Sequence, residues 1–294
     1  MSPTSRRIEG WILIVLSAVA WSTAGFFTRA VDADAWTLLF WRGVFAGLAI
    51  MAMTIAIYRG ETVAVFRRLG LPGLLLALSS TAGMLCFISG LTLTTVANVY
   101  AIYATAPFVT AACALVILGE RAPRTTLFAS AVAMAGVLVT LDPSDLGGNL
   151  LGQLLAFGMT LSMALMTVIL RWKRDLPMVP ALGLSAWLAT LVCWFFCEPF
   201  AIPAADIGIL ALFGIVNSAV GLSLYGWGSR LTPAAEVALI SLIDVPLGPL
   251  WVWLFFDETP GARTLVGGLI VLAAVVFHIL GEMRVASKPK FAAE

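Results

Sequence analysis

The sequence predicts an all-α polytopic membrane protein with ten transmembrane helices, arranged as two inverted five-helix repeats with both termini in the cytoplasm. Three observations predict this class: an apolar composition, ten apolar segments of span length, and motifs that recur at a constant distance. Of 294 residues, 61% are hydrophobic and 11% are charged, whereas a soluble domain has about 45–50% apolar and about 25% charged residues. With a net charge of +1, this composition excludes a soluble globular protein, a disordered chain, a disulfide scaffold and a nucleic-acid-binding protein.

Apolar segments of span length follow one another along the chain. A helix that crosses a bilayer needs about 20 mainly apolar residues. The segments are separated by short polar breaks and lie at 10–30, 36–58, 70–91, 95–118, 125–141, 149–170, 178–197, 207–227, 233–256 and 262–282. Because few residues remain outside them, we expect a single membrane domain without a large extramembrane part.

The basic residues orient these spans, because cytoplasmic loops carry an excess of Lys and Arg. With the N-terminus in the cytoplasm, 14 of the 17 basic residues fall on the cytoplasmic side: Arg6, Arg7, Arg59, Arg67, Arg68, Arg121, Arg124, Arg171, Lys173, Arg174, Arg230, Arg284, Lys288 and Lys290. Arg29 and Arg263 fall on the opposite side with the acidic residues Asp32, Asp34, Asp142, Asp145, Glu198, Asp206, Asp257 and Glu258. The asymmetry predicts cytoplasmic termini and a multi-pass protein of the bacterial-type plasma (inner) membrane.

The two halves of the chain repeat each other. Gly119-Glu120 and Asp257-Glu258 are 138 residues apart, and Leu93-Thr94 and Leu231-Thr232 are separated by the same distance. We interpret 1–145 and 146–294 as two five-helix repeats within one membrane domain. Since five is odd, the second repeat enters the membrane from the opposite side. Inverted repeats of this kind are typical of secondary transporters, which open alternately to either side of a midplane site.

Three charged residues, Arg42, Glu236 and Asp244, lie well within predicted spans, where each costs about 2.5–3.5 kcal/mol on insertion scales. Asp244 is about eleven residues, or about 16 Å, into the ninth span and therefore near mid-bilayer. It is either a substrate or proton site or a buried acid paired for packing. Arg42 could snorkel outward, pair with an acid, or bind a substrate carboxylate. The lone His278 is interpreted as a packing or interfacial residue.

Prolines follow Asp244 and predict a break in its helix. Pro246 and Pro249 lack the N–H groups that would bond to the carbonyls of Leu242 and Val245, so these carbonyls should become free acceptors. Aligned on proline, Thr105 and Pro107 are the counterparts of Asp244 and Pro246 in the first repeat. We expect Pro107, Pro246 and Pro249 to act as helix breaks or gating points.

Glu236 lies in the first turn of its span, where the helix dipole favours an acid. Its counterpart in the first repeat is Asn98, near the start of the fourth span. The alternative to simple helix-end stabilisation is that Glu236 and Asn98 are gate residues at opposite faces of the membrane.

Aromatic residues occur deep within several spans. Tyr100 and Tyr103 are three residues apart and therefore share one helix face near Asn98 and Thr105. Further deep aromatic residues are Trp21, Trp41, Trp187, Tyr225 and Trp227. A cavity lined in this way suits an organic solute with an aromatic or apolar body, although any single ring could instead face lipid.

These motifs resemble a known family. The run from Ala97-Asn98 through Pro107 to Gly119-Glu120-Arg121 is similar to the drug/metabolite transporter superfamily in its ten-helix EamA form. Its second copy runs from Ala234-Ala235-Glu236 through Pro246 to Asp257-Glu258, and departs from the family pattern at Asp257 and in the spacing of Asp244 and Pro246. Phe40-Trp41-Arg42 resembles the second-span arginine of the family. Over its whole length the chain looks most like the YddG-type aromatic amino-acid exporters.

The resemblance implies a central cavity lined by spans 1, 3, 4, 6, 8 and 9, with spans 5 and 10 at the periphery. It implies export of amino acids, especially aromatic or hydrophobic ones, with other metabolites, cationic aromatic drugs or nucleotide sugars as alternatives. The sequence contains no nucleotide-binding loop, so we expect energy from a proton gradient or from solute exchange. No cofactor, metal or enzymatic activity is expected. The expected partners are a small-molecule substrate and the lipid bilayer; the oligomeric state stays open.

Overall fold

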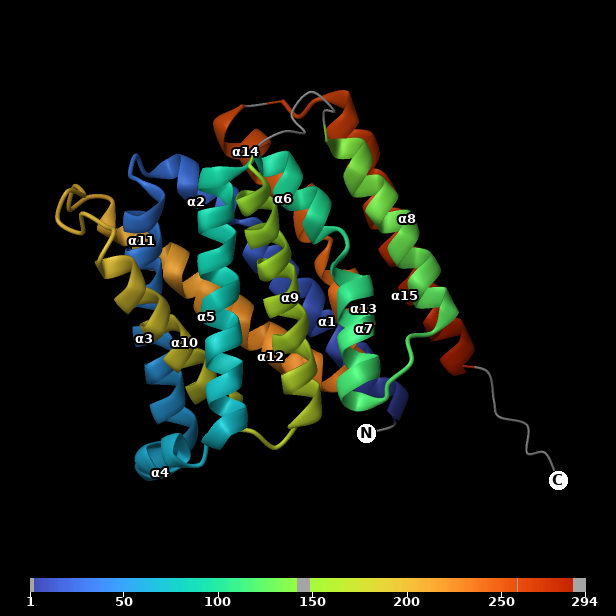
Figure 1. Cartoon of the computed structure of the whole chain (residues 1–294), viewed down its shortest axis with the longest axis horizontal. Coiled ribbons are helices and arrows are strands. Elements are labelled where there is room, and N and C mark those ends of the chain that lie inside the picture. The colour runs from blue at the N-terminus through green and yellow to red at the C-terminus, as the bar shows by residue number, and fades with distance from the viewer. Residues whose placement is uncertain (1–2, 142–148, 258, 288–294) are drawn as a thin grey trace.

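The computed structural model describes residues 3–141, 149–257 and 259–287, and helices make up its architecture (Figure 1). Asp142, Asp145, Glu258, Lys288 and Lys290, which entered the orientation argument, lie outside the described residues. The first half contains α1 (Pro3–Ser22), α2 (Ala24–Ala30), α3 (Ala35–Tyr58), η1 (Arg59–Glu61), α4 (Thr62–Arg67), α5 (Gly70–Leu93), α6 (Val96–Tyr103), α7 (Ala106–Leu118) and α8 (Arg124–Thr140). The second half contains α9 (Leu150–Trp172), α10 (Met178–Trp194), α11 (Ile207–Phe213), η3 (Gly214–Val220), α12 (Gly221–Leu231), α13 (Ala234–Ser241), α14 (Asp244–Phe256) and α15 (Ala262–Ser287).

Seven helical runs among the described residues are long and apolar enough to cross a membrane. The pair α6 and α7, bent by 42° at a short break, would be an eighth span. Helices α8 and α10 are apolar but have only 17 residues each. The fold is therefore that of an all-helical, multi-pass membrane protein, and the count of ten spans stays a prediction.

Two broken helices have the same design. Helices α6 and α13 each have 8 residues, and α7 and α14 each have 13. All four ends of one pair are 138 residues from those of the other. This offset pairs Asp244 with Ala106 and Thr105 with Ile243, so the alignment on proline is wrong by one residue. The position of the break, rather than the proline, sets the register.

The ends of α7 and α14 explain a departure from the family pattern. Gly119 ends α7 with φ +69°, and Asp257 ends α14 with φ +55°. Both residues occupy the left-handed region, which glycine adopts freely and Asp tolerates better than most residues. Asp257 therefore fills a glycine position without changing the backbone.

The two halves pack against each other through matching helix pairs. Helix α1 packs on α12, and α9 packs on α5. Gly152 of α9 permits the second contact, because a Cβ there would come within 2.8 Å of Thr94 Cβ. Gly10 of α1 lies in the same way against Leu231 and Thr232.

Helices α8 and α15 pack side by side at one edge of the molecule, where Gly136 and Gly267 let their backbones approach (Figure 1). The first and last described residues lie at one end of the molecule, together with α4, α7 and α13 (Figure 1). We call this end, which carries Arg7, Glu120 and Arg230, the inner end. The opposite end is called the outer end.

Candidate functional site

A cavity of about 260 Å³ lies where the two halves meet. Its lining comes from α1, α2, α3, α5 and α6 of the first half and from α9, α10, η3, α12 and α14 of the second. The six expected spans contribute, but so do spans 2 and 7, through residues such as Gly43 of α3 and Ser185 of α10. Within the described residues, α8 and α15 supply none of the lining, in agreement with peripheral positions for spans 5 and 10.

Asp244 places a carboxylate at the cavity wall, in the first turn of α14. The N-terminus of this half-helix directs its positive dipole end at the carboxylate. The Oδ1 atom of Asp244 is buried and accepts no hydrogen bond from the described residues. Tyr100 and Tyr103 of α6 line the same cavity and interact electrostatically with Asp244.

Arg42 brings a positive charge to the same cavity from α3. Its Nη1 donates to Asn217 Oδ1 at 3.4 Å, and its guanidinium lies 5.4 Å from the ring centre of Phe213. Among the described residues it makes no salt bridge with a carboxylate. Arg42 thus faces the protein interior, and the alternative in which it snorkels outward is wrong.

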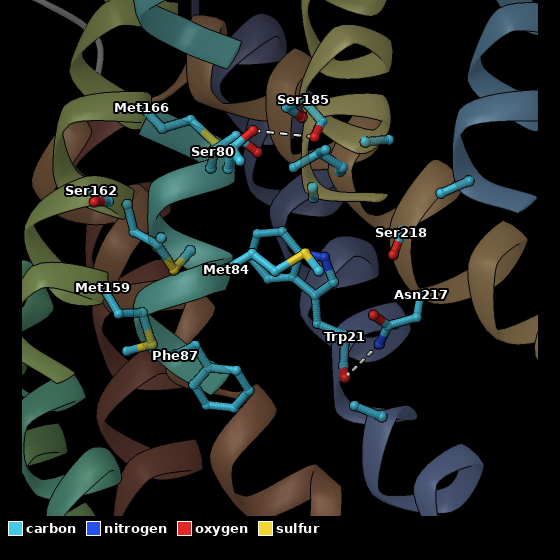
Figure 2. Close-up of a pocket in the computed structure, with 18 of the residues that line it drawn as sticks. Trp21, Ser80, Met84, Phe87, Met159, Ser162, Met166, Ser185, Asn217 and Ser218 are labelled. Atoms are coloured by element: carbon cyan, nitrogen blue, oxygen red, sulfur yellow. Dashed lines mark hydrogen bonds between the residues drawn. The ribbon is translucent and has the colours of Figure 1, made fainter. Parts of the chain in front are cut away.

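Asn217 is a cavity residue that the sequence analysis missed. It lies in η3, a π-helical segment, and its Nδ2 donates to the carbonyls of Ala20 at 3.1 Å and Trp21 at 2.9 Å (Figure 2). The amide therefore fixes the end of α1 and presents its oxygen to Arg42. Short π-helical segments are frequent at functional sites, and the sequence signal was a lone amide side chain within an apolar span.

The rest of the wall is mainly apolar. Figure 2 shows Trp21 projecting into the cavity, which is also lined by Met84, Phe87, Met159 and Met166. Methionine side chains adapt to ligands of different shapes. Small hydroxyl groups interrupt this surface at Ser79, Ser80, Ser162 and Ser218. The sequence analysis identified Trp21 but not the methionines, because Met is common in every apolar span.

Three of the proposed aromatic site residues lie outside the cavity. Trp41 Nε1 donates to the carbonyl of Pro199 at 3.0 Å. The hydroxyl of Tyr225 is 2.5 Å from Thr167 Oγ1, and its ring packs against that of Trp21 with centroids 4.8 Å apart. Trp227 is 37% exposed on the protein surface. Helical periodicity alone did not separate these positions from the cavity face.

The expected polar groups around the breaks are largely bonded locally. Thr105 Oγ1 donates to the carbonyl of Ile102 at 2.6 Å, and Asn98 Nδ2 donates to Thr94 Oγ1 at 2.9 Å. The carbonyl of Leu242 accepts the N–H of Val245 at 3.2 Å, so it is not the free acceptor that was expected. A tight turn between α13 and α14 replaces the hydrogen bond that proline removes.

The prolines and Glu236 occupy different parts of the broken helices. Pro107 and Pro246 lie in the first turns of α7 and α14, and Pro249 lies inside α14. Glu236 lies in α13 at the inner end, fully buried and outside the cavity lining.

A multi-pass helical protein whose broken helices meet at an interior cavity has the architecture of a membrane transporter. The pattern of the EamA-like transporter family matches residues 8–142 and 150–280. The chain therefore belongs to the EamA-like transporter family, and it is an integral protein of the inner (plasma) membrane.

Individual relatives agree with the family. The pseudopaline exporter CntI of Pseudomonas aeruginosa is 24% identical over 278 residues, which cover 91% of this chain and 95% of that protein. The riboflavin transporter of Rhizobium johnstonii is 23% identical over 313 residues, with coverage of 97% and 95%. One solved crystal structure superposes with a TM-score of 0.77 and 17% identity over 95% of this chain and 99% of its own, a likeness of fold alone.

Proposed function

We propose that this protein is a secondary transporter that exports a small organic solute by alternating access around the cavity. Ten spans in two inverted repeats, 1–145 and 146–294, would carry this mechanism, with both termini in the cytoplasm. The twofold match of the family pattern and the constant offset of the broken helices support the repeats. The distribution of basic residues supports the orientation.

The observation that carries the proposal is that two side chains of opposite charge line one mainly apolar cavity. Arg42 and Asp244 both line it, and neither is in a salt bridge with another described residue. Charges in a membrane interior need a partner. We propose that the solute supplies both partners: a carboxylate for Arg42 and an ammonium group for Asp244. Trp21, Tyr100 and Tyr103 would hold its apolar body.

An aromatic or hydrophobic amino acid fits these requirements. A larger aromatic metabolite is the second candidate, because one relative that matches nearly the whole chain is a riboflavin transporter. The cavity volume of about 260 Å³ lies just below the range of about 300–1,000 Å³ that is typical of ligand pockets, and it favours the smaller solute.

The test is flux in proteoliposomes that contain the purified protein and labelled aromatic amino acids, aliphatic amino acids or riboflavin. We expect saturable amino-acid flux that falls at least about tenfold in Asp244→Asn and in Arg42→Gln, since one lost charged contact is worth roughly 1.5–3 kcal/mol. Asp206→Asn, a charge change in the connection before α11 and outside the cavity, is the matched control. Riboflavin flux without amino-acid flux would select the second candidate, and flux unchanged in both cavity variants would contradict the proposed site.

A further inference from the structure

A second group of charged side chains lies at the inner end, away from the cavity. It joins three helices and consists of Arg7 and Trp11 of α1, Glu236 of α13, and His278 and Glu282 of α15. Glu236 is fully buried, and the side chain of His278 is 1% exposed. We call these five residues the inner cluster.

Glu236 is the centre of the inner cluster. Its Oε1 accepts a hydrogen bond from Arg7 Nη2, and its Oε2 accepts one from Trp11 Nε1 at 3.1 Å. Arg7 Nη2 also donates to Glu282 Oε2 at 2.8 Å. A buried carboxylate with this many donors does more than stabilise the first turn of its helix, which was the simpler interpretation of Glu236.

The charges of the inner cluster do not balance while His278 is neutral. It then holds two carboxylates and one guanidinium. The Nε2 atom of His278 is buried without a hydrogen-bond partner among the described residues, and it lies 3.9 Å from Glu236 Oε1. A proton on Nε2 would neutralise the cluster, and a small rotation of the imidazole would bring Nε2–H within hydrogen-bonding distance of Glu236.

We infer that the inner cluster is a proton-binding site, separate from the substrate cavity, with His278 Nε2 as the proton acceptor and Glu236 as the group that holds the imidazolium. Bulk water can supply the proton, because the side chains of Arg7 and Glu282 are 28% and 15% exposed at the rim of the cluster.

Other charged groups lie near the inner cluster. Glu9 of α1, Arg124 of α8 and Arg284 of α15 are exposed at the same end, where water screens them. The neighbouring helix α8 contributes Thr125, whose Oγ1 is 3.3 Å from Glu282 Oε1. Helix α13 contributes no ionisable group except Glu236.

Proton binding would help to keep the inner end closed, because α13 is held there by contacts on two sides. The inner cluster ties α13 to α1 and α15. The N–H of Ala234, the first residue of α13, donates to Glu120 Oε1 at 3.3 Å, and Glu120 Oε2 also accepts from Arg171 Nε at 2.5 Å. Opening the inner end requires α13 to separate from α1, so protonation of His278 should hold that end closed.

Nuclear magnetic resonance can observe the proton directly, because His278 is the single histidine of the chain. We would label histidine with ¹⁵N in the full-length protein in lipid nanodiscs and follow the ring nitrogens from about pH 5 to about pH 9. We expect one imidazole that converts between charged and neutral forms in this range. Glu236→Gln should reduce the charged population at a fixed intermediate pH, and Glu61→Gln, which alters an exposed acid, should leave it unchanged.

An imidazole that stays neutral over the whole range, or one whose titration is the same in Glu236→Gln, would overturn the inference. Folding is checked on the same samples by the dispersion of the remaining signals. Glu282→Gln provides a second variant at the rim of the cluster, and it should also reduce the charged population if Glu236→Gln does not fold.

Closure can be measured with Cys113, which packs beside Ala114, Val168 and Ala234 at the inner end. In a variant that keeps only this cysteine, we expect the maleimide labelling rate to rise with pH more steeply than in the same variant with His278→Gln, whose pH dependence reports the ionisation of the thiol alone. Equal pH dependence with and without His278 would overturn the link to closure. Neither measurement needs a transported solute. The inference can therefore fail while the proposed function stands, and the proposed function can fail while the inference stands.

Discussion

At the scale of single residues, Arg42 and Asp244 line the cavity, whereas Glu236 lies outside it in the inner cluster. Arg42, Glu236 and Asp244 stood out because charge is rare within apolar spans. Whether Arg42 faced lipid, another helix or a cavity depended on helix rotation and on η3, neither of which periodicity fixes. Asn217 was missed because a single uncharged amide within an apolar span is a weak signal in the sequence. In the structure it donates to two backbone carbonyls and accepts a hydrogen bond from Arg42.

The first residue-level prediction concerns the left-handed ends of α7 and α14. Asp257→Gly should raise the free energy of unfolding by up to about 1 kcal/mol, because glycine has no Cβ penalty at φ +55°. Gly119→Asp should lower it by a similar amount. Thermal unfolding followed by circular dichroism in detergent measures both, with Gly208→Ala, a site with open space, as control. A loss of stability in Asp257→Gly would show that the Asp side chain itself holds the turn.

At the scale of elements, the bounds of several helices could be predicted from the sequence, whereas the breaks inside helices could not be placed to the residue. The predicted segment 36–58 corresponds to α3, and 70–91 to α5, because polar breaks and turn residues mark helix ends. The break near Pro246 was expected, but its position before Asp244 and the local bond that satisfies Leu242 were not. Those details depend on how the backbone turns, which proline spacing does not specify.

The second prediction concerns the contact of α9 with α5. Gly152→Leu should lower stability by about 1–3 kcal/mol, because any side chain there meets Thr94 and the backbone of Leu93. The measurement is the same thermal unfolding experiment. Gly281→Leu is the matched control, since this glycine of α15 has no neighbouring atoms within contact distance. Equal effects of the two substitutions would contradict the packing role of Gly152.

At the scale of the whole molecule, motifs that recur at a fixed distance predicted the repeat, and the broken helices recur at the same distance of 138 residues. Pairing of helices between the halves follows from that repeat, and the structure pairs α1 with α12 and α5 with α9. The full set of helices around the cavity was not predicted, because apart from Arg42 and Ile50 the helices α3 and α10 line it with small residues such as Gly43 and Ser185. Small residues in apolar spans indicate close packing as readily as they indicate a cavity.

The third prediction tests the proposed orientation with two native cysteines. Cys197 follows α10 at the outer end, and Cys113 lies in α7 near the inner end. In intact cells, a membrane-impermeant maleimide should label a variant that keeps only Cys197 and spare one that keeps only Cys113. Burial raises the pKa of the Cys197 thiol, so less thiolate is present at neutral pH and the labelling rate should increase as the pH rises. Labelling of Cys113 alone would reverse the orientation.

Arg42 and Asp244 line the cavity without a salt bridge to any described residue, which has a consequence for the empty carrier. In the proposed mechanism, the protein without a solute must close this cavity over a cation and an anion that have no bound charges to balance them. A bound zwitterion removes that electrostatic barrier. The loaded protein should then reorient faster than the unloaded one, so that its natural working mode is exchange. Adding solute on the far side of the vesicle membrane should accelerate release from the near side, and the empty return step should set the rate of net efflux.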